Sequence, residues 1–139
     1  MKKIFTILFA TLVLVGCKNT KESKELGDQN AGKTLTGWYY YHLMQHNYDS
    51  IPKLMNDDTA DIQNFIKVLK DREEKLGHIQ SFEIKDWEKT SQNKKEKTKD
   101  FVIEYDVTYQ NAKSLETIYL NKKGNDLKIT KIEYEEEQK

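Results

Sequence analysis

The period of the hydrophobic residues changes at Gly77. Before this residue, apolar side chains recur at every third or fourth position, which is typical of helices with one buried face. After it, apolar and polar residues alternate, which is typical of strands with one buried face. Helices followed by sequential strands predict an α+β domain, in which the helices pack on one face of an antiparallel sheet.

Three helices are predicted before Gly77. The first covers about residues 35–46, and the second begins near Pro52, which suits the first turn of a helix. The third follows an N-cap at Asp58 or Thr59. It ends at Gly77, because glycine readily adopts the left-handed conformation that terminates helices.

Four strands are predicted after Gly77. They correspond to the segments HIQSFEIKDWE, KDFVIEYDVTYQ, SLETIYLN and DLKITKIEYE, and tight turns join the last three at Asn111-Ala112 and Gly124-Asn125. The inward face of the second strand is predicted to carry five apolar or aromatic side chains: Phe101, Ile103, Tyr105, Val107 and Tyr109.

Two features of the later strands remain open or irregular. The third strand can bury either Leu115 and Tyr119 or Ile118 and Leu120, and the alternation supports both choices. The apolar positions of the fourth strand change parity after Ile129, which predicts a β-bulge.

The N-terminus has the pattern of an export signal. Lys2 and Lys3 precede the apolar run Ile4–Val15, which is too short to span a bilayer. The next residues, LVGC at 14–17, resemble the lipobox of bacterial lipoproteins. The resemblance implies that residues 1–16 are removed as a signal peptide and that Cys17 carries lipid. Acyl chains would attach the protein to the membrane of the cell envelope. Lys18 in place of aspartate implies the outer membrane in a Gram-negative host.

Residues 17–33 are predicted to form a flexible tether, because they contain one large apolar residue among many polar ones. The domain is then residues 34–136. Removal of Lys2 and Lys3 from 23 basic residues, against 23 acidic ones, leaves a net charge near −2. This balance argues against nucleic acid as a partner. With Cys17 as the only cysteine, the domain has no internal disulfide. A monomer is expected.

The element order, together with particular segments, resembles the NTF2-like (cystatin-like) superfamily, and most closely its small envelope lipoproteins. The matching segments are WYYYHLMQHNYDSIPKLM, LKDREEKLGHIQSFE, FVIEYDVTY and DLKITKIEY, and the resemblance covers about residues 34–136. It implies helices packed on a curved four-stranded antiparallel sheet, which together enclose a conical pocket. Some members use this pocket for catalysis and others for ligand binding.

The leading functional prediction is a non-catalytic binding or accessory module. Trp38, Tyr41, Tyr105 and Tyr109 are predicted to line a cleft between helix and sheet, where phenols offer apolar area and a polar tip. The cleft would hold a small apolar ligand or an envelope protein partner. The alternative is that these side chains are core alone.

Two other function classes are kept as alternatives. A small-molecule hydrolase or isomerase would use Asp86 or His42, but the inward face of the second strand offers no carboxylate or imidazole, so no catalytic residue is predicted. A surface interaction or immunity-type lipoprotein would use the Lys-rich segment 88–100, which is otherwise expected to be a solvated loop.

No metal or cofactor is predicted. His42 and His46 share one helix face and could chelate a cation, with Asp49 as the nearest further ligand. A metal site needs at least a third ligand, and the chain contains no HExxH pattern. Ordinary histidines on a half-buried helix face are therefore expected.

Overall fold

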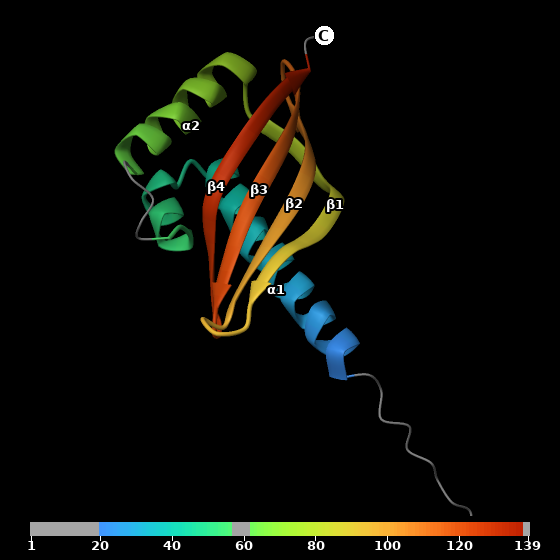
Figure 1. Cartoon of the computed structure of the whole chain (residues 1–139). Coiled ribbons are helices and arrows are strands. Elements are labelled where there is room, and N and C mark those ends of the chain that lie inside the picture. The colour runs from blue at the N-terminus through green and yellow to red at the C-terminus, as the bar shows by residue number, and fades with distance from the viewer. Residues whose placement is uncertain (1–19, 57–61, 138–139) are drawn as a thin grey trace, which may run out of the picture.

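The computed structural model describes residues 20–56 and 62–137 (Figure 1). Its helical part comprises α1 (Thr20–Met44), the short 3-10 helix η1 (Tyr48–Leu54) and α2 (Ile62–Leu76). The strands follow as β1 (Ile79–Asn93), β2 (Thr98–Tyr109), β3 (Lys113–Lys123) and β4 (Asp126–Glu137). Gly77 ends α2 with a φ of +80°, as predicted from the change of period. The second predicted helix, expected to begin near Pro52, is the short 3-10 helix η1, and Pro52 lies inside it.

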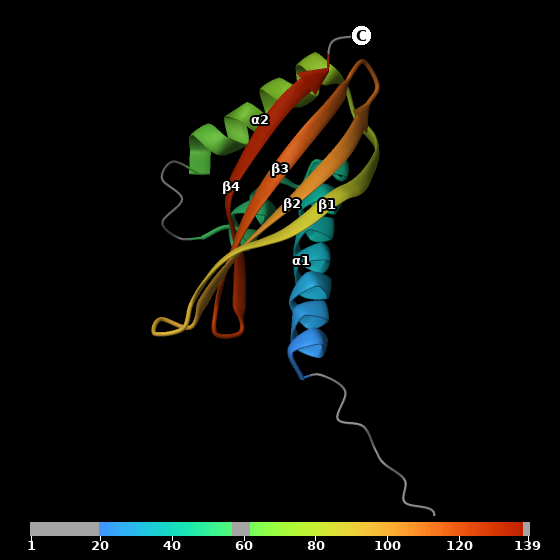
Figure 2. The ribbon, with the colours of Figure 1, turned by 45° about the vertical axis from the view of Figure 1, so that its right-hand side comes forward.

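The four strands form one antiparallel sheet in the order β1-β2-β3-β4. Both α1 and α2 lie on the same side of this sheet, and Figure 2 shows both of them behind the strands. The prediction of an α+β fold, with helices packed on a four-stranded antiparallel meander, is confirmed.

The core lies between α1 and the inner faces of β2 and β3. All five side chains predicted for the inner face of β2 are buried. On β3 the buried apolar residues are Ile118 and Leu120, which settles the choice left open by the sequence. Helix α1 contributes Tyr39 and Tyr40, both fully buried. The ring of Tyr40 stacks on Phe82 of β1, with 4.4 Å between the ring centroids.

The predicted bulge in β4 is confirmed at Thr130. Tyr119 pairs with Lys131 and Leu120 pairs with Ile129, so Thr130 is the extra residue on β4. Ile132 is three residues after Ile129, so regular alternation would point its side chain outward. Because of the bulge, the side chain of Ile132 points inward and packs against the core.

The Lys-rich segment 88–100 is more regular than predicted. β1 continues to Asn93 and β2 begins at Thr98, so only residues 94–97 form the turn. Asn93 Oδ1 accepts hydrogen bonds from the backbone N–H groups of Lys95 (3.1 Å) and Glu96 (3.3 Å). The expected long loop is therefore wrong, because cross-strand hydrogen bonds extend the hairpin even where both faces are polar.

Helix α1 begins at Thr20, so the prediction of a flexible tether is wrong for residues 20–33. Its Lys- and Glu-rich sequence favours helix where packing does not decide. Buried Asp28 ties the helix to the sheet by accepting hydrogen bonds from Lys99 Nζ and Lys122 Nζ, each at 2.5 Å. Gly32 lies under the indole of Trp87. The tether was predicted because this segment lacks an apolar stripe. In the structure, polar contacts and one close approach hold the helix in place of such a stripe.

Substitution of Gly32 tests this docking of α1. A Cβ at Gly32 would lie 2.5 Å from Cζ3 and 2.7 Å from Cη2 of Trp87, which itself stacks on Phe101. Gly32→Ala is therefore expected to lower the free energy of unfolding by about 1–2 kcal/mol in urea denaturation, after the gain in helix propensity. The matched control is Gly37→Ala on the same helix, where a Cβ meets nothing within 4 Å. This change should raise the free energy of unfolding by about 0.5–1 kcal/mol. Equal stabilisation by both changes would contradict the close contact.

Several predictions concern residues outside the described ranges. The signal peptide 1–16 and the lipid site Cys17 lie there, as do the predicted caps Asp58 and Thr59. Among residues 20–56 and 62–137, no helix combines the length and the apolar character needed to cross a bilayer.

Candidate functional site

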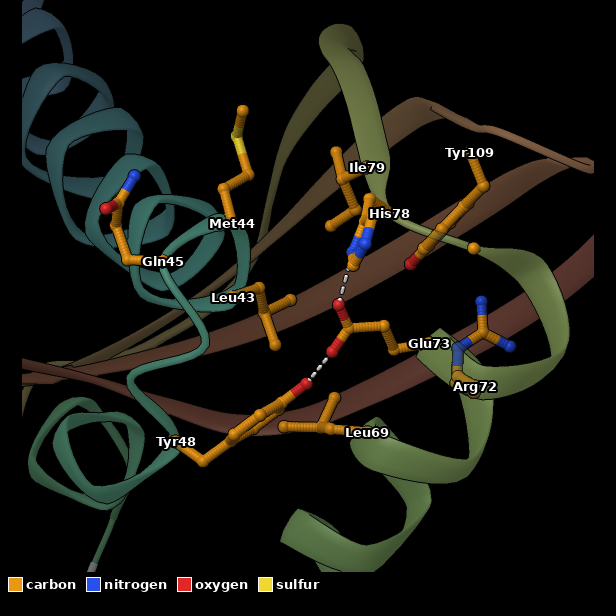
Figure 3. Close-up of a pocket in the computed structure, with 11 residues that line it drawn as sticks. Leu43, Met44, Gln45, Tyr48, Leu69, Arg72, Glu73, His78, Ile79 and Tyr109 are labelled. Carbon is orange, nitrogen blue, oxygen red and sulfur yellow. Dashed lines mark hydrogen bonds and ion pairs between the residues drawn. The ribbon is translucent and has the colours of Figure 1, made fainter.

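A pocket opens at the C-terminal end of α1, between this helix, η1, the end of α2 and the first residues of β1 (Figure 3). Its volume is about 110 Å³. Leu43, Leu69 and Ile79 form apolar walls, with Met44 at the edge. Apart from Gly77, the other lining groups are polar or ionisable: Gln45, Tyr48, Arg72, Glu73, His78 and Tyr109.

A buried carboxylate lies behind the polar wall. Glu116 of β3 is 0% exposed, and its Oε1 accepts hydrogen bonds from Tyr109 Oη (2.7 Å) and Arg72 Nη2 (3.2 Å). Its Oε2 accepts one from Tyr40 Oη at 3.0 Å. Burial raises the pKa of Glu116, and the hydrogen bonds and the charge of Arg72 offset this rise only in part.

Arg72 connects this carboxylate to the edge of the sheet. Besides Glu116, it donates to Glu136 Oε1 and to Ser114 Oγ, each at 3.0 Å. The guanidinium carbon lies 3.9 Å from the ring centroid of Tyr134. Arg72 Nε is buried and has no hydrogen-bond partner among the described residues.

The mouth of the pocket carries a second carboxylate, Glu73 of α2. His78 Nδ1 lies 2.6 Å from Glu73 Oε1, and His46 Nδ1 lies 2.9 Å from the same oxygen. The Tyr48 hydroxyl donates to the other oxygen, and Figure 3 shows Tyr48, Glu73 and His78 in one line. Burial raises the pKa of Glu73, but the hydrogen bonds from Tyr48, His78 and His46 outweigh it, so the net pKa is lowered.

The four aromatic residues predicted to line one cleft do not converge. Trp38 and Tyr41 are 53% and 50% exposed on the outer side of α1, where their rings pack edge to face. Tyr105 is buried in the core and hydrogen-bonds Thr36 Oγ1 at 2.6 Å. Tyr109 alone of the four lines the pocket. The predicted cleft is thus wrong in its composition, because Tyr39 and Tyr40, rather than Trp38 and Tyr41, face the sheet.

The ionisable residues considered in the sequence are also distributed differently. Asp86 is exposed on β1, and Asp49 is exposed in η1. His42 Nδ1 lies 3.5 Å from Asn47 Nδ2, away from the pocket lining. His46 meets Glu73 and His78 rather than His42 and Asp49, which had been its expected neighbours.

Neither a family model, nor a curated protein, nor a solved structure matches this chain. What the site can do therefore follows from its own geometry.

Four residues of this site were missed in the sequence: Arg72, Glu73, His78 and Glu116. Strand alternation puts Glu116 on the same face as Ile118 and Leu120, but the sequence did not show that this face is the buried one. For Arg72 the sequence signal was that it is the only arginine of the chain and lies in the third predicted helix. No sequence pattern indicated that His46 and His78 meet, since they lie on different elements.

Proposed function

We propose that this chain is a lipid-anchored, non-catalytic protein of the bacterial cell envelope, which binds a small ligand with an apolar body and a polar head. The pocket at the end of α1 carries the proposal, because it combines apolar walls with a few convergent polar groups. This combination is typical of small-molecule sites, where the apolar surface supplies affinity and the polar groups fix orientation.

The polar side of the pocket indicates what the ligand head contains. Arg72 and Gln45 line the pocket, and both side chains donate hydrogen bonds. We therefore expect a head group that contains a carbonyl, carboxylate or similar oxygen.

The position of Glu116 supports a structural rather than a catalytic role for this carboxylate. Both oxygens of Glu116 are occupied by Tyr40, Tyr109 and Arg72, and Glu116 is absent from the pocket lining. A general acid or base must come within hydrogen-bond reach of its substrate. The role assigned to Glu116 is therefore to hold Arg72 and Tyr109 in place behind the pocket.

The envelope part of the proposal rests on the lipobox-like residues 14–17 and on the architecture. Helices packed on an antiparallel meander, with a pocket at one end, are compatible with an NTF2-like domain. We place Cys17 as the lipid site just before α1, in the outer membrane if the host is Gram-negative.

An envelope protein partner is the second candidate, and one observation favours it. Four large apolar side chains on α1 are exposed: Leu26, Trp38, Tyr41 and Met44. At 100° per residue they fall within about 120° of arc on one side of the helix. Trp38, Tyr41 and Met44 follow one another at three-residue spacing on this side, and neighbouring exposed apolar side chains of this kind mark interaction surfaces. A partner that binds there would lose affinity on Trp38→Ser and would be unaffected by changes inside the pocket.

Ligand binding is tested by methyl NMR with a panel of small apolar fragments that carry one carboxylate or amide. We expect chemical-shift changes confined to Leu43, Leu69 and Ile79, with loss of binding in Ile79→Trp, which fills the pocket. Val68→Trp is the matched control, because Val68 is exposed on α2 outside the lining. Absence of any shift at these methyl groups across the panel would contradict the proposed site.

Lipid attachment is tested by the intact mass of the full chain expressed in a bacterial host. We expect a mass that lacks residues 1–16 and includes a diacylglyceryl group, together with recovery in the membrane fraction. Cys17→Ser should remove the added lipid mass. A wild-type chain with an unmodified Cys17 would overturn this part of the proposal.

A further inference from the structure

Two of the three histidines of the chain meet beside a carboxylate at the mouth of the pocket. His46, Glu73 and His78 each offer one ligand atom, and these atoms all lie within 4.8 Å of one another. The rings of His46 and His78 are 5.1 Å apart between centroids. The residues come from three different segments, namely the turn after α1, helix α2 and the residues just before β1, so their meeting is a product of the tertiary fold.

The backbone holds both histidines in defined positions. His46 has a φ of +55°, in the left-handed region that few non-glycine residues adopt, and its N–H donates to Leu43 O at 3.0 Å. His78 follows the left-handed Gly77. The N–H of His78 donates to Gln110 Oε1 at 3.1 Å, and its carbonyl accepts the N–H of Gln110 at 3.0 Å. One histidine thus precedes α2 in the sequence and the other follows it, and hydrogen bonds hold the backbone of both.

From this geometry we propose that His46, Glu73 and His78 form a binding site for a divalent transition-metal ion, with Zn²⁺ as the expected occupant. The proposal goes beyond ligand binding in the pocket and does not depend on it. Two imidazole nitrogens and one carboxylate oxygen are ligands that Zn²⁺ prefers, whereas Mg²⁺ and Ca²⁺ prefer sites made of oxygen alone.

The two distances between the carboxylate and the imidazoles require only small side-chain movements, and the histidine ligand atoms lie within 4.8 Å of each other. Ligand bonds of about 2.0–2.1 Å in a tetrahedron place the ligand atoms about 3.3 Å apart. In the structure, Glu73 Oε1 lies 2.9 Å from His46 Nδ1 and 2.6 Å from His78 Nδ1. A slight opening of the three side chains, together with loss of the protons on the two Nδ1 atoms, admits a metal ion. Both histidines are more than half exposed, so they have room to rotate.

A second layer of contacts orients the carboxylate. The Tyr48 hydroxyl donates to Glu73 Oε2 and leaves Oε1 directed at the two histidines. Hydrogen bonds of this kind to ligating groups are a regular part of metal sites. Three protein ligands leave the fourth tetrahedral position open. Because Glu73 and His78 also line the pocket, we expect this position to be reached by water or by a donor atom of a bound ligand.

The test is titration of the tag-free full chain with Zn²⁺ alone, followed by isothermal titration calorimetry and by competition with a chromogenic chelator. We expect a 1:1 complex whose dissociation constant rises about tenfold or more in His78→Gln and in Glu73→Gln. His46→Asn is expected to have the same effect, and asparagine tolerates the left-handed backbone at this position. His42→Gln is the matched control on α1 and should leave binding unchanged.

Two further measurements distinguish this site from metal binding at Cys17 and from a loss of folding in the variants. Cys17→Ser removes the only thiol of the chain and should leave the Zn²⁺ affinity of the unlipidated protein unchanged. Thermal unfolding without metal should show that the exposed His78→Gln variant folds as the wild type does. Tetrahedral Co²⁺ bands in the wild type, lost in His78→Gln, would support the three named ligands. Failure to bind Zn²⁺, or binding that is equal in wild type, His78→Gln and Glu73→Gln, would overturn the proposal.

Discussion

Glu116→Leu is expected to lower the free energy of unfolding by about 3–5 kcal/mol, which is the cost of removing one partner from a buried ion pair. The change leaves the guanidinium of Arg72 without its most buried counter-charge. It also removes the acceptor for the hydroxyls of Tyr40 and Tyr109. Urea denaturation at neutral pH measures the loss, and a domain of ordinary stability would be close to unfolding.

A matched control and a double variant make this prediction specific. Thr117→Leu alters the next residue of β3, on the opposite face of the sheet, and is expected to change stability by no more than about 0.5 kcal/mol. Arg72→Met combined with Glu116→Leu should cost less than the sum of the single changes, because neither charge is then left alone. Additive losses would show that the two side chains do not stabilise each other.

Asp28→Asn is expected to lower the free energy of unfolding by about 2–4 kcal/mol at neutral pH, since it leaves two lysines facing a neutral amide in a partly buried site. Burial raises the pKa of Asp28, but the hydrogen bonds from Lys122 and Lys99 outweigh it and lower the net pKa below 3.8. The carboxylate is therefore more easily ionised in the folded than in the unfolded chain, and its contribution is present at pH values above about 4.

This stabilisation is lost as the pH falls through the lowered folded-state pKa of Asp28. Denaturation of wild type and Asp28→Asn between pH 7 and pH 3 should show two curves that converge on the acid side. Asp49→Asn, in exposed η1, is the control and should follow the wild type within about 0.5 kcal/mol at every pH. Hydrogen exchange should report faster opening of residues 20–33 in Asp28→Asn. A wild-type stability for Asp28→Asn at pH 7 would contradict the docking of this part of α1.

The order of elements could be predicted because it depends on local periodicity. The helical spacing before Gly77 and the alternation in β2 each reflect one buried face, and the change of parity after Ile129 identified the bulge at Thr130. The buried face of β3 could not be chosen in the same way. Its inward positions include Glu116, whose burial depends on Arg72 in another element. A charged residue on the buried face makes the two faces look alike in sequence.

The start of α1 and the site at its end were missed for a related reason. Residues 20–33 lack an apolar stripe, and their helix is held by Lys99 and Lys122, which are far away along the chain. The aromatic run at 38–41 was assigned to the wrong face, because four consecutive aromatic residues give no preference for the pair that packs inward. His46, Glu73 and His78 meet through three elements, and no spacing pattern describes that encounter.

The continuous helix α1 also sets a length scale for the proposed lipid-anchored protein. Its 25 residues, at about 1.5 Å per residue, make a rod of about 37 Å. The pocket and the proposed metal site lie at the C-terminal end of this rod, and Cys17 precedes its first residue by three positions in the sequence. A disordered tether would let the binding site approach the bilayer. A rod that is docked to the sheet instead fixes the distance between the first residue of α1 and the pocket. When the rod stands upright on the membrane, the site would sample molecules in the aqueous layer above the head groups.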